Sequence, residues 1–120
     1  MLIRYKKCYE KIAVGLLSLL STAADIKNVF QTVRLYEDDD RLQLFLWKQG
    51  EDIIGVLGIQ IMASDRAVIR HISVNPSYRE EGIDVQMCDA LAAFLGADVK
   101  IIPLEEAEET LPGTAEKSVD

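Results

Sequence analysis

The chain has 120 residues, of which 49% are apolar, and a formal net charge of −7 at pH 7. This length suits one domain with a single modest core, and the apolar content excludes wholesale disorder. Nucleic acids and anionic membranes need clustered Lys and Arg, so the acidic balance argues against both as the main partner and mildly favours a cationic one, such as an amine.

Cysteine usage and hydropathy indicate a cytoplasmic protein. Cys8 and Cys88 are too few for a disulfide or metal framework, so we expect no metal site. Cys88 is expected to be a small buried helix residue rather than a nucleophile. The most apolar stretch, residues 13–20, is too short to span a membrane, and the lysines before it do not make a signal peptide.

The first forty residues predict a strand and two helices. Leu2–Lys7 alternates weakly and is expected to be the strand. Tyr9–Leu20 follows as a helix, with one apolar side made of Ile12, Leu16, Leu19 and Leu20. A second helix follows Thr22 and Asp25, which resemble a capping box. Its apolar stripe is Ile26, Val29, Phe30 and Val33.

The acidic run at residues 37–40 ends the second helix. Four like charges in a row usually form a solvated turn. Attraction of a cationic acceptor is the functional alternative.

The middle of the chain predicts three strands. Leu42–Lys48 and Ile53–Met62 flank a turn and form a hairpin. Gly55 and Gly58 in the second of these strands are expected to mark a bulge or a close approach of another segment. The third strand is Val68–Val74, which is rich in β-branched residues.

A short loop and a helix follow the third strand. Asn75-Pro76-Ser77 ends the strand because proline lacks the N–H that a ladder needs, and residues 79–82 form a polar loop. The helix then begins at Ile83 and ends at Gly96, which suits a C-cap. Its apolar positions are Ile83, Met87, Ala90, Leu91 and Phe94. Asp98–Ile102 is the last predicted strand.

The predicted order is β-α-α-β-β-β-α-β, an α/β (α+β) arrangement with a mixed sheet and helices on its faces. Residues 1–103 would form the domain, and residues 104–120 an acidic, partly disordered tail. The last strand would lie at a sheet edge, which proteins tend to cover. A homodimer that covers this edge is therefore one expectation.

The unit of strand, loop and helix carries a known motif. Residues 73–84, SVNPSYREEGID, resemble the V-x-P-x-x-R-x-x-G-x-G/A signature of the GCN5-related N-acetyltransferase (GNAT) superfamily. Residues 2–7, 43–48 and 69–77 resemble the small GNAT-like proteins encoded in riboflavin operons, a similarity that covers roughly the first hundred residues. The resemblance implies a GNAT fold with a truncated C-terminal end. It also implies an N-acetyltransferase that uses acetyl-CoA as cosubstrate and a small-molecule or peptide amine as acceptor.

The resemblance further implies how the cosubstrate is held. Backbone groups of Ile72 and Val74 would pair with the pantetheine arm. The pyrophosphate would bind the backbone amides of Arg79, Glu80, Glu81, Gly82, Ile83 and Asp84. The N-terminus of a helix binds anions, and glycine lets the backbone come close to a ligand. The side chain of Arg79 would either add a charge-assisted contact or lie on the surface.

Asp84 departs from the family pattern, which has glycine or alanine at this position. At ~4 Å its carboxylate would repel a phosphate by on the order of several kcal/mol, and Glu80 and Glu81 would add to this repulsion. Alternatively, the carboxylate satisfies free N–H groups of the first helical turn. Both accounts combine into one hypothesis, in which the Asp84 carboxylate occupies the place of the phosphate.

Acetyl transfer to an amine requires a base, and an acid for the leaving thiolate helps. His71 is the candidate base, because it is the only titratable group of the central strand with a suitable pKa. A structural histidine is the alternative. The tyrosine that serves the family as acid has no match after Pro103. The rival function is therefore a non-catalytic GNAT-fold binding or regulatory module with a degenerate CoA site, or a structural partner that binds no CoA.

Overall fold

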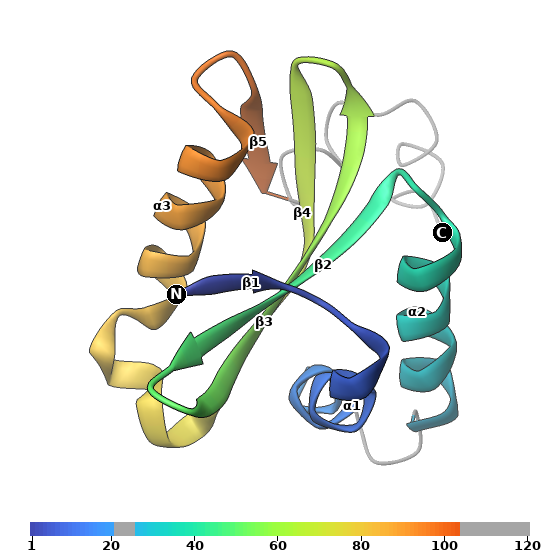
Figure 1. Ribbon diagram of the computed structural model, residues 1–120, viewed down its shortest axis with the longest axis vertical. Helices are drawn as coiled ribbons and strands as arrows, with labels where there is room; N and C mark the ends of the chain where they lie inside the picture. Colours follow the sequence, from blue (N-terminus) through green and yellow to red (C-terminus); the bar gives the residue numbers. More distant parts are fainter. Residues whose placement is uncertain (21–25, 104–120) are drawn as a thin grey trace, which may run out of the picture.

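The computed structural model describes residues 1–20 and 26–103 (Figure 1). The strands are β1 (Leu2–Arg4), β2 (Leu42–Gln49), β3 (Asp52–Ala63), β4 (Arg66–Val74) and β5 (Lys100–Pro103). The helices are α1 (Glu10–Ser18), α2 (Ile26–Asp38) and α3 (Ile83–Leu95), with 3-10 helices η1 (Lys7–Tyr9) and η3 (Pro76–Glu81). The predicted order β-α-α-β-β-β-α-β is confirmed. The capping box and the acidic tail lie outside the described residues.

The five strands form one mixed sheet in the order β1-β2-β3-β4-β5. β1 to β4 are antiparallel neighbours, whereas β4 and β5 are parallel and joined through α3. The β4–β5 ladder extends only from Arg66 opposite Lys100 to Ile69 opposite Pro103. The second half of β4, residues 70–74, therefore has no strand on that side among the residues described.

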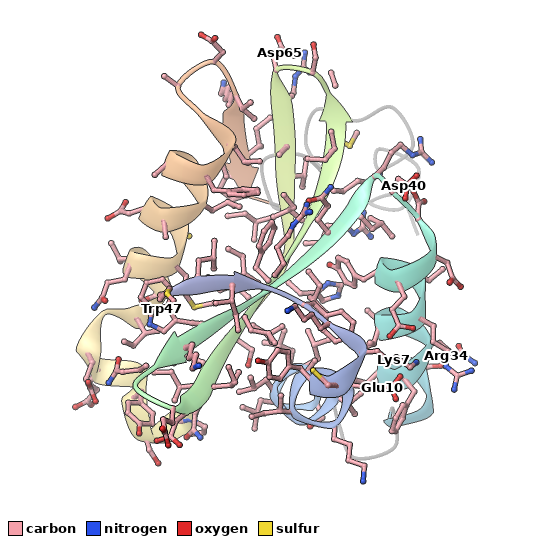
Figure 2. All side chains as sticks on the ribbon, in the orientation of Figure 1. Lys7, Glu10, Arg34, Asp40, Trp47 and Asp65 are labelled. Atoms are coloured by element: carbon pink, nitrogen blue, oxygen red, sulfur yellow. The ribbon has the colours of Figure 1, made fainter. Side chains whose placement is uncertain are left out.

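Helices cover both faces of the sheet: α1 and α2 lie on one side and α3 on the other (Figure 1). Alternation along β2 divides its side chains between the two layers, because successive residues of a strand point to opposite faces. Leu44 and Leu46 pack with α1 and α2, and Phe45 and Trp47 pack with α3; Figure 2 labels Trp47. The apolar run of β2 thus supplies both halves of the core.

Three register shifts interrupt the ladders, and two of them lie beside a glycine of β3. One lies next to Gly55, and the other inserts Arg70 into β4 next to Gly58. A Cβ on Gly55 would lie 2.9 Å from the Met87 sulfur, and a Cβ on Gly58 would overlap the Tyr36 hydroxyl. The prediction that these two glycines mark bulges or close approaches is confirmed.

The predicted apolar faces of the helices are only partly right. Ile12 of α1 and the two residues that follow this helix, Leu19 and Leu20, are exposed, and the buried residues of α1 are Ala13, Val14, Leu16 and Leu17. The apolar run is nearly continuous here, so periodicity alone leaves the buried face open. In α2, Phe30 is 38% exposed, and in α3, Phe94 is 55% exposed.

Several predicted boundaries also shift. β1 ends at Arg4 rather than at Lys7, which belongs to η1, although the Tyr5 N–H still donates to the Leu44 carbonyl (2.9 Å). The predicted polar loop at residues 79–82 lies largely within η3, and β5 begins at Lys100. Gly96 is confirmed as the C-cap of α3, with φ +95° and its N–H donating to the Ala92 carbonyl (3.0 Å).

No helix of the described segments is long and apolar enough to cross a membrane. Among the same residues, no strand pairs with the outer side of β5. The homodimer that would cover this edge stays a prediction.

Candidate functional site

The free edge of β4 carries the first half of the site. The Asn75 N–H donates to the Ile54 carbonyl (2.7 Å), so the backbone of Asn75 faces β3. The direction of backbone groups alternates along an antiparallel strand. The N–H and C=O groups of Ile72 and Val74 therefore face away from β3, toward the side on which the described residues place no strand. Sequence analysis assigned these two residues to the pantetheine arm.

The turn into α3 carries the second half. The Asn75 side chain accepts a hydrogen bond from the Ser77 N–H (2.9 Å), and Gly82 has a left-handed backbone with φ +70°. The Gln86 N–H makes the first bond of α3, to the Gly82 carbonyl (3.1 Å). The N–H groups of residues 83–85 precede this bond, so they lack acceptors within the helix. They are the donors that an anion at this turn would meet.

The six amides predicted to bind the pyrophosphate are not equally free. Those of Arg79, Glu80 and Glu81 belong to η3, whose i→i+3 bonds use backbone N–H groups. Ile83 and Asp84 lie in the first turn of α3. The side chains of Glu80 and Glu81 are exposed, and the side chain of Arg79 lies outside the described part of the structure.

A hollow of about 380 Å³ joins the two halves. It is lined by Leu20, Ile72, Ser73, Val74 and Asp84. The Asp84 side chain is exposed, and within the described residues its carboxylate accepts no hydrogen bond. The place of Asp84 in the first turn of α3 agrees with a charge that complements the helix dipole, but no N–H of the described residues bonds to its carboxylate. Asp84 instead brings a free negative charge to the mouth of the hollow.

His71 lies one residue before this hollow and pairs with a residue of α2. Its Nδ1 is 2.6 Å from the Tyr36 hydroxyl oxygen, and the two rings meet edge to face. Burial raises the pKa of Tyr36, which is 7% exposed, above its ordinary range. Burial, and then the charge of Arg70, lowers the pKa of His71. Both groups are therefore neutral at pH 7.

A second hollow of about 350 Å³ opens beside this pair, between α2 and the sheet. Tyr36, Asp39, Arg70 and His71 line it, together with residues of α2, β2 and β3. Arg70 is held by the Gln60 side chain, to which it donates (2.7 Å). Arg70 and His71 line this hollow and residues 72–74 line the first, so consecutive residues of β4 border the two hollows.

The acidic run at residues 37–40 divides between two surroundings. Glu37 accepts from the Tyr5 hydroxyl (2.6 Å) and pairs with Lys7 (3.3 Å), which also pairs with Glu10 (2.8 Å; Figure 2). The Tyr5 hydrogen bond is the main cause that lowers the pKa of Glu37. These contacts tie β1 and η1 to α2. Asp39 instead lines the second hollow.

Sequence analysis missed Tyr36, because a pair separated by 35 residues leaves no local signal. The available hint was its place three residues after Val33 on the buried side of α2, opposite a glycine in β3. Cys88 is half-buried, and burial, followed by the charges of Asp84 and Asp89, raises the pKa of its thiol. A raised thiol pKa disfavours a nucleophilic role.

Comparisons with known proteins agree on one family. The model of the acetyltransferase (GNAT) family matches residues 14–108. A relative from Bacillus methanolicus, named an uncharacterized N-acetyltransferase in lysA 3'region, is 49% identical over 105 residues, which are 88% of this chain and 87% of the relative.

Solved structures agree on the fold. The structure of AAC(6')-Iy in complex with the bisubstrate analog CoA-S-monomethyl-acetylneamine has a TM-score of 0.71 at 18% identity, over 99% of this chain and 85% of that chain. A possible acetyltransferase from Clostridium difficile 630 has a TM-score of 0.69 at 9% identity, over 86% of this chain and 76% of that chain. At such identities the structures show the fold alone.

Proposed function

The chain belongs to the GNAT family of acetyltransferases, and from this premise we propose that it transfers the acetyl group of acetyl-CoA to the nitrogen of an amine acceptor. The observation that carries the proposal is the hollow shared by β4 and α3. There, Ile72 and Val74, whose backbone groups face away from β3, line the same hollow as Asp84 in the first turn of α3. An extended polar chain that ends in an anion fits unpaired strand groups followed by a helix N-terminus.

The backbone of this hollow suits acetyl-CoA, but the side chain of Asp84 does not. Gly82 gives a left-handed entry into α3, and a Cβ there would meet nothing within 4 Å, so the approach is open. Asp84 places a carboxylate beside the donors that would receive a pyrophosphate. Binding therefore has to overcome like-charge repulsion, and we expect weak affinity that improves with salt.

The second hollow is the proposed entry for the acceptor. Consecutive residues of β4 border it and the first hollow, and the Asp39 carboxylate lines it, which suits a protonated amine. We extend the proposal to a cytoplasmic protein of the riboflavin-operon type. Its supports are the two free cysteines and the resemblance over the first hundred residues or so.

The rival function is a GNAT-fold binding or regulatory module without turnover. The free Asp84 carboxylate at the hollow favours it, because a site closed to pyrophosphate would leave the fold available for other partners. Calorimetric titration with acetyl-CoA, followed by measurement of thiol release with a panel of amines, separates the two. Binding with transfer supports the enzyme, whereas binding without transfer to any amine supports the module.

The charge of Asp84 can be tested directly. We expect Asp84→Gly and Asp84→Asn to bind acetyl-CoA about tenfold tighter or more, because each removes one repulsive charge from the hollow. Asp89→Asn is the matched control, since it changes net charge equally on an exposed position of the same helix that does not line the hollow. Equal gains for Asp84→Asn and Asp89→Asn would show a general charge effect instead.

A wild type that binds no acetyl-CoA, together with an Asp84→Gly variant that does, would mean a cofactor site closed by its own carboxylate. Absence of binding in both proteins would sink the enzyme and the CoA-binding module together.

A further inference from the structure

The proton shared by Tyr36 and His71 decides what the imidazole can do. The oxygen and nitrogen are 2.6 Å apart, a length typical of a hydroxyl donor rather than of a ring N–H donor. A phenol is also a stronger donor than a neutral imidazole, and an imidazole nitrogen is a stronger acceptor than a phenol oxygen. The Tyr36 hydroxyl therefore donates to Nδ1, and a neutral His71 then carries its own proton on Nε2.

Building on the proposed function, we propose that His71 is a hydrogen-bond donor to the thioester carbonyl oxygen and not the base of the reaction, and that Tyr36 is the positioning residue that fixes this role. As the amine nitrogen bonds to the carbonyl carbon, the carbonyl electron pair moves to oxygen, and the Nε2–H donates a hydrogen bond to this negatively charged oxygen. Collapse of this intermediate re-forms the carbonyl and breaks the C–S bond. The nitrogen gives its proton to water, and the thiolate takes one from water, so Nε2 keeps its proton throughout.

The position of His71 fits this role. It follows Arg70 at the bulge and lines the second hollow, and the next residue of β4, Ile72, lines the first. Nε2 makes no hydrogen bond with the described residues, and no buried side-chain nitrogen or oxygen among them lacks a partner. Nε2 is therefore accessible from the hollow and free to donate.

The packing around Tyr36 holds its hydroxyl in place. The ring comes from α2 and is buried, and its hydroxyl lies over Gly58, where a Cβ would overlap it. The titratable and charged groups around the imidazole are Tyr36 from α2, Asp39 after α2, and Arg70 from β4. The positive charge of Arg70 beside His71 also favours a developing negative charge nearby.

The chain has a single histidine, so its NMR signals need no assignment. Nitrogen-15 shifts of the imidazole at pH 7.5, without any substrate, distinguish protonation at Nε2 from protonation at Nδ1. We expect Nε2–H in the wild type and a mixture of both tautomers in Tyr36→Phe. A proton on Nδ1 in the wild type would overturn the inference, whether or not the protein turns over.

Two substitutions of His71 separate a donor from a base. His71→Ala should lower kcat by about 10²–10³-fold, as removal of one oxyanion donor does. His71→Gln keeps an N–H near the Nε2 position but cannot take up a proton at neutral pH, so we expect it to stay within about tenfold of the wild type. Equal inactivity of both variants would identify His71 as a base.

The pH profile gives an independent readout. For a base, kcat falls as the pH drops through the pKa of His71, which NMR measures on the same protein. For a donor, kcat shows no step at that pKa. Tyr36→Phe should lower kcat without changing KM for acetyl-CoA, and should have no further effect in the His71→Ala background.

Acetyl-CoA titration of the same proteins distinguishes failure of the proposed function from failure of the donor role of His71. A wild type that neither binds nor transfers refutes the proposed function, and the tautomer then decides the inference alone. A wild type that transfers, with His71→Gln as inactive as His71→Ala, refutes only the donor role.

Discussion

Gly58 shows how much one missing side chain supports. It faces α2 from β3, and the Tyr36 hydroxyl lies where its Cβ would be. Any side chain at this position displaces the phenol and with it the hydrogen bond to His71. A strand glycine is normally a weakness, because it loses more conformational freedom than other residues on folding. At Gly58 this cost is offset because the missing side chain leaves room for the buried Tyr36.

Gly58→Ala should therefore destabilise the protein by about 1–3 kcal/mol, the usual range for overpacking. The matched control is Gly15→Ala in α1, where a Cβ meets nothing within 4 Å. That change should stabilise by about 0.5–1 kcal/mol through helix propensity. Urea unfolding of the three proteins measures both effects, and similar unfolding free energies for the two variants would contradict the account.

At the scale of elements, α3 does two things at once. Its buried face packs against the sheet through Ile83, Met87 and Leu91, and its first turn presents the free N–H groups of the site. Met87 reaches the sheet because Gly55 has no side chain. The packing of the helix thus fixes where its N-terminus lies relative to the free edge of β4.

Leu91→Ala should cost about 2–5 kcal/mol, because it leaves a cavity under a fully buried side chain. Val85→Ala on the same helix should change stability by less than about 0.5 kcal/mol, since Val85 is 59% exposed. Thermal or urea unfolding tests this contrast. A small cost for Leu91→Ala would mean that α3 is held by its ends rather than by its buried face.

The sequence predicts elements well where a single period dominates. The hairpin turn and the β-branched run located β2 to β4, and the polar loop at residues 79–82 and Gly96 located the ends of α3. Periodicity failed in α1, where a nearly continuous apolar run fits several faces, and it could not distinguish η3 from a loop. The hydrogen bond between Tyr36 and His71 could not be predicted, because the two residues are far apart in the sequence and no local pattern links them. The motif pointed to the backbone half of the site, and long-range packing supplied the side-chain half.

At the scale of the whole molecule, both helical layers contact β4. The α3 layer brings the helix N-terminus to the free edge at residues 72–74, and the α2 layer brings Tyr36 to His71. The β4–β5 ladder stops at Ile69, just before this stretch begins. A sheet that stayed paired to its end would use the same backbone groups for its own hydrogen bonds. Within the described residues, the end of β5 at Pro103 therefore leaves the backbone groups of the candidate site without a strand partner.

The same arrangement makes the stability of the whole protein depend on pH near neutrality. Folding lowers the pKa of His71 from its ordinary value of 6.5, so between the two pKa values the unfolded chain binds more protons than the folded one. This contribution is present above about pH 6.5 and is lost as the pH falls from there through the folded-state pKa. Folding also lowers the pKa of Glu37, and the stability that this carboxylate contributes is lost only as the pH falls below about 4.5.

We therefore expect the unfolding free energy of the wild type to fall between pH 7.5 and pH 5.5. His71→Gln should show a much flatter dependence, because it removes the only histidine and leaves the carboxylates to titrate below this window. Urea unfolding of both proteins at several pH values in this range measures the two slopes. Parallel slopes would mean that His71 has the same proton affinity in both states, and a buried, neutral imidazole beside Tyr36 would then be excluded, because desolvation of the ring has to appear as a cost of protonating it.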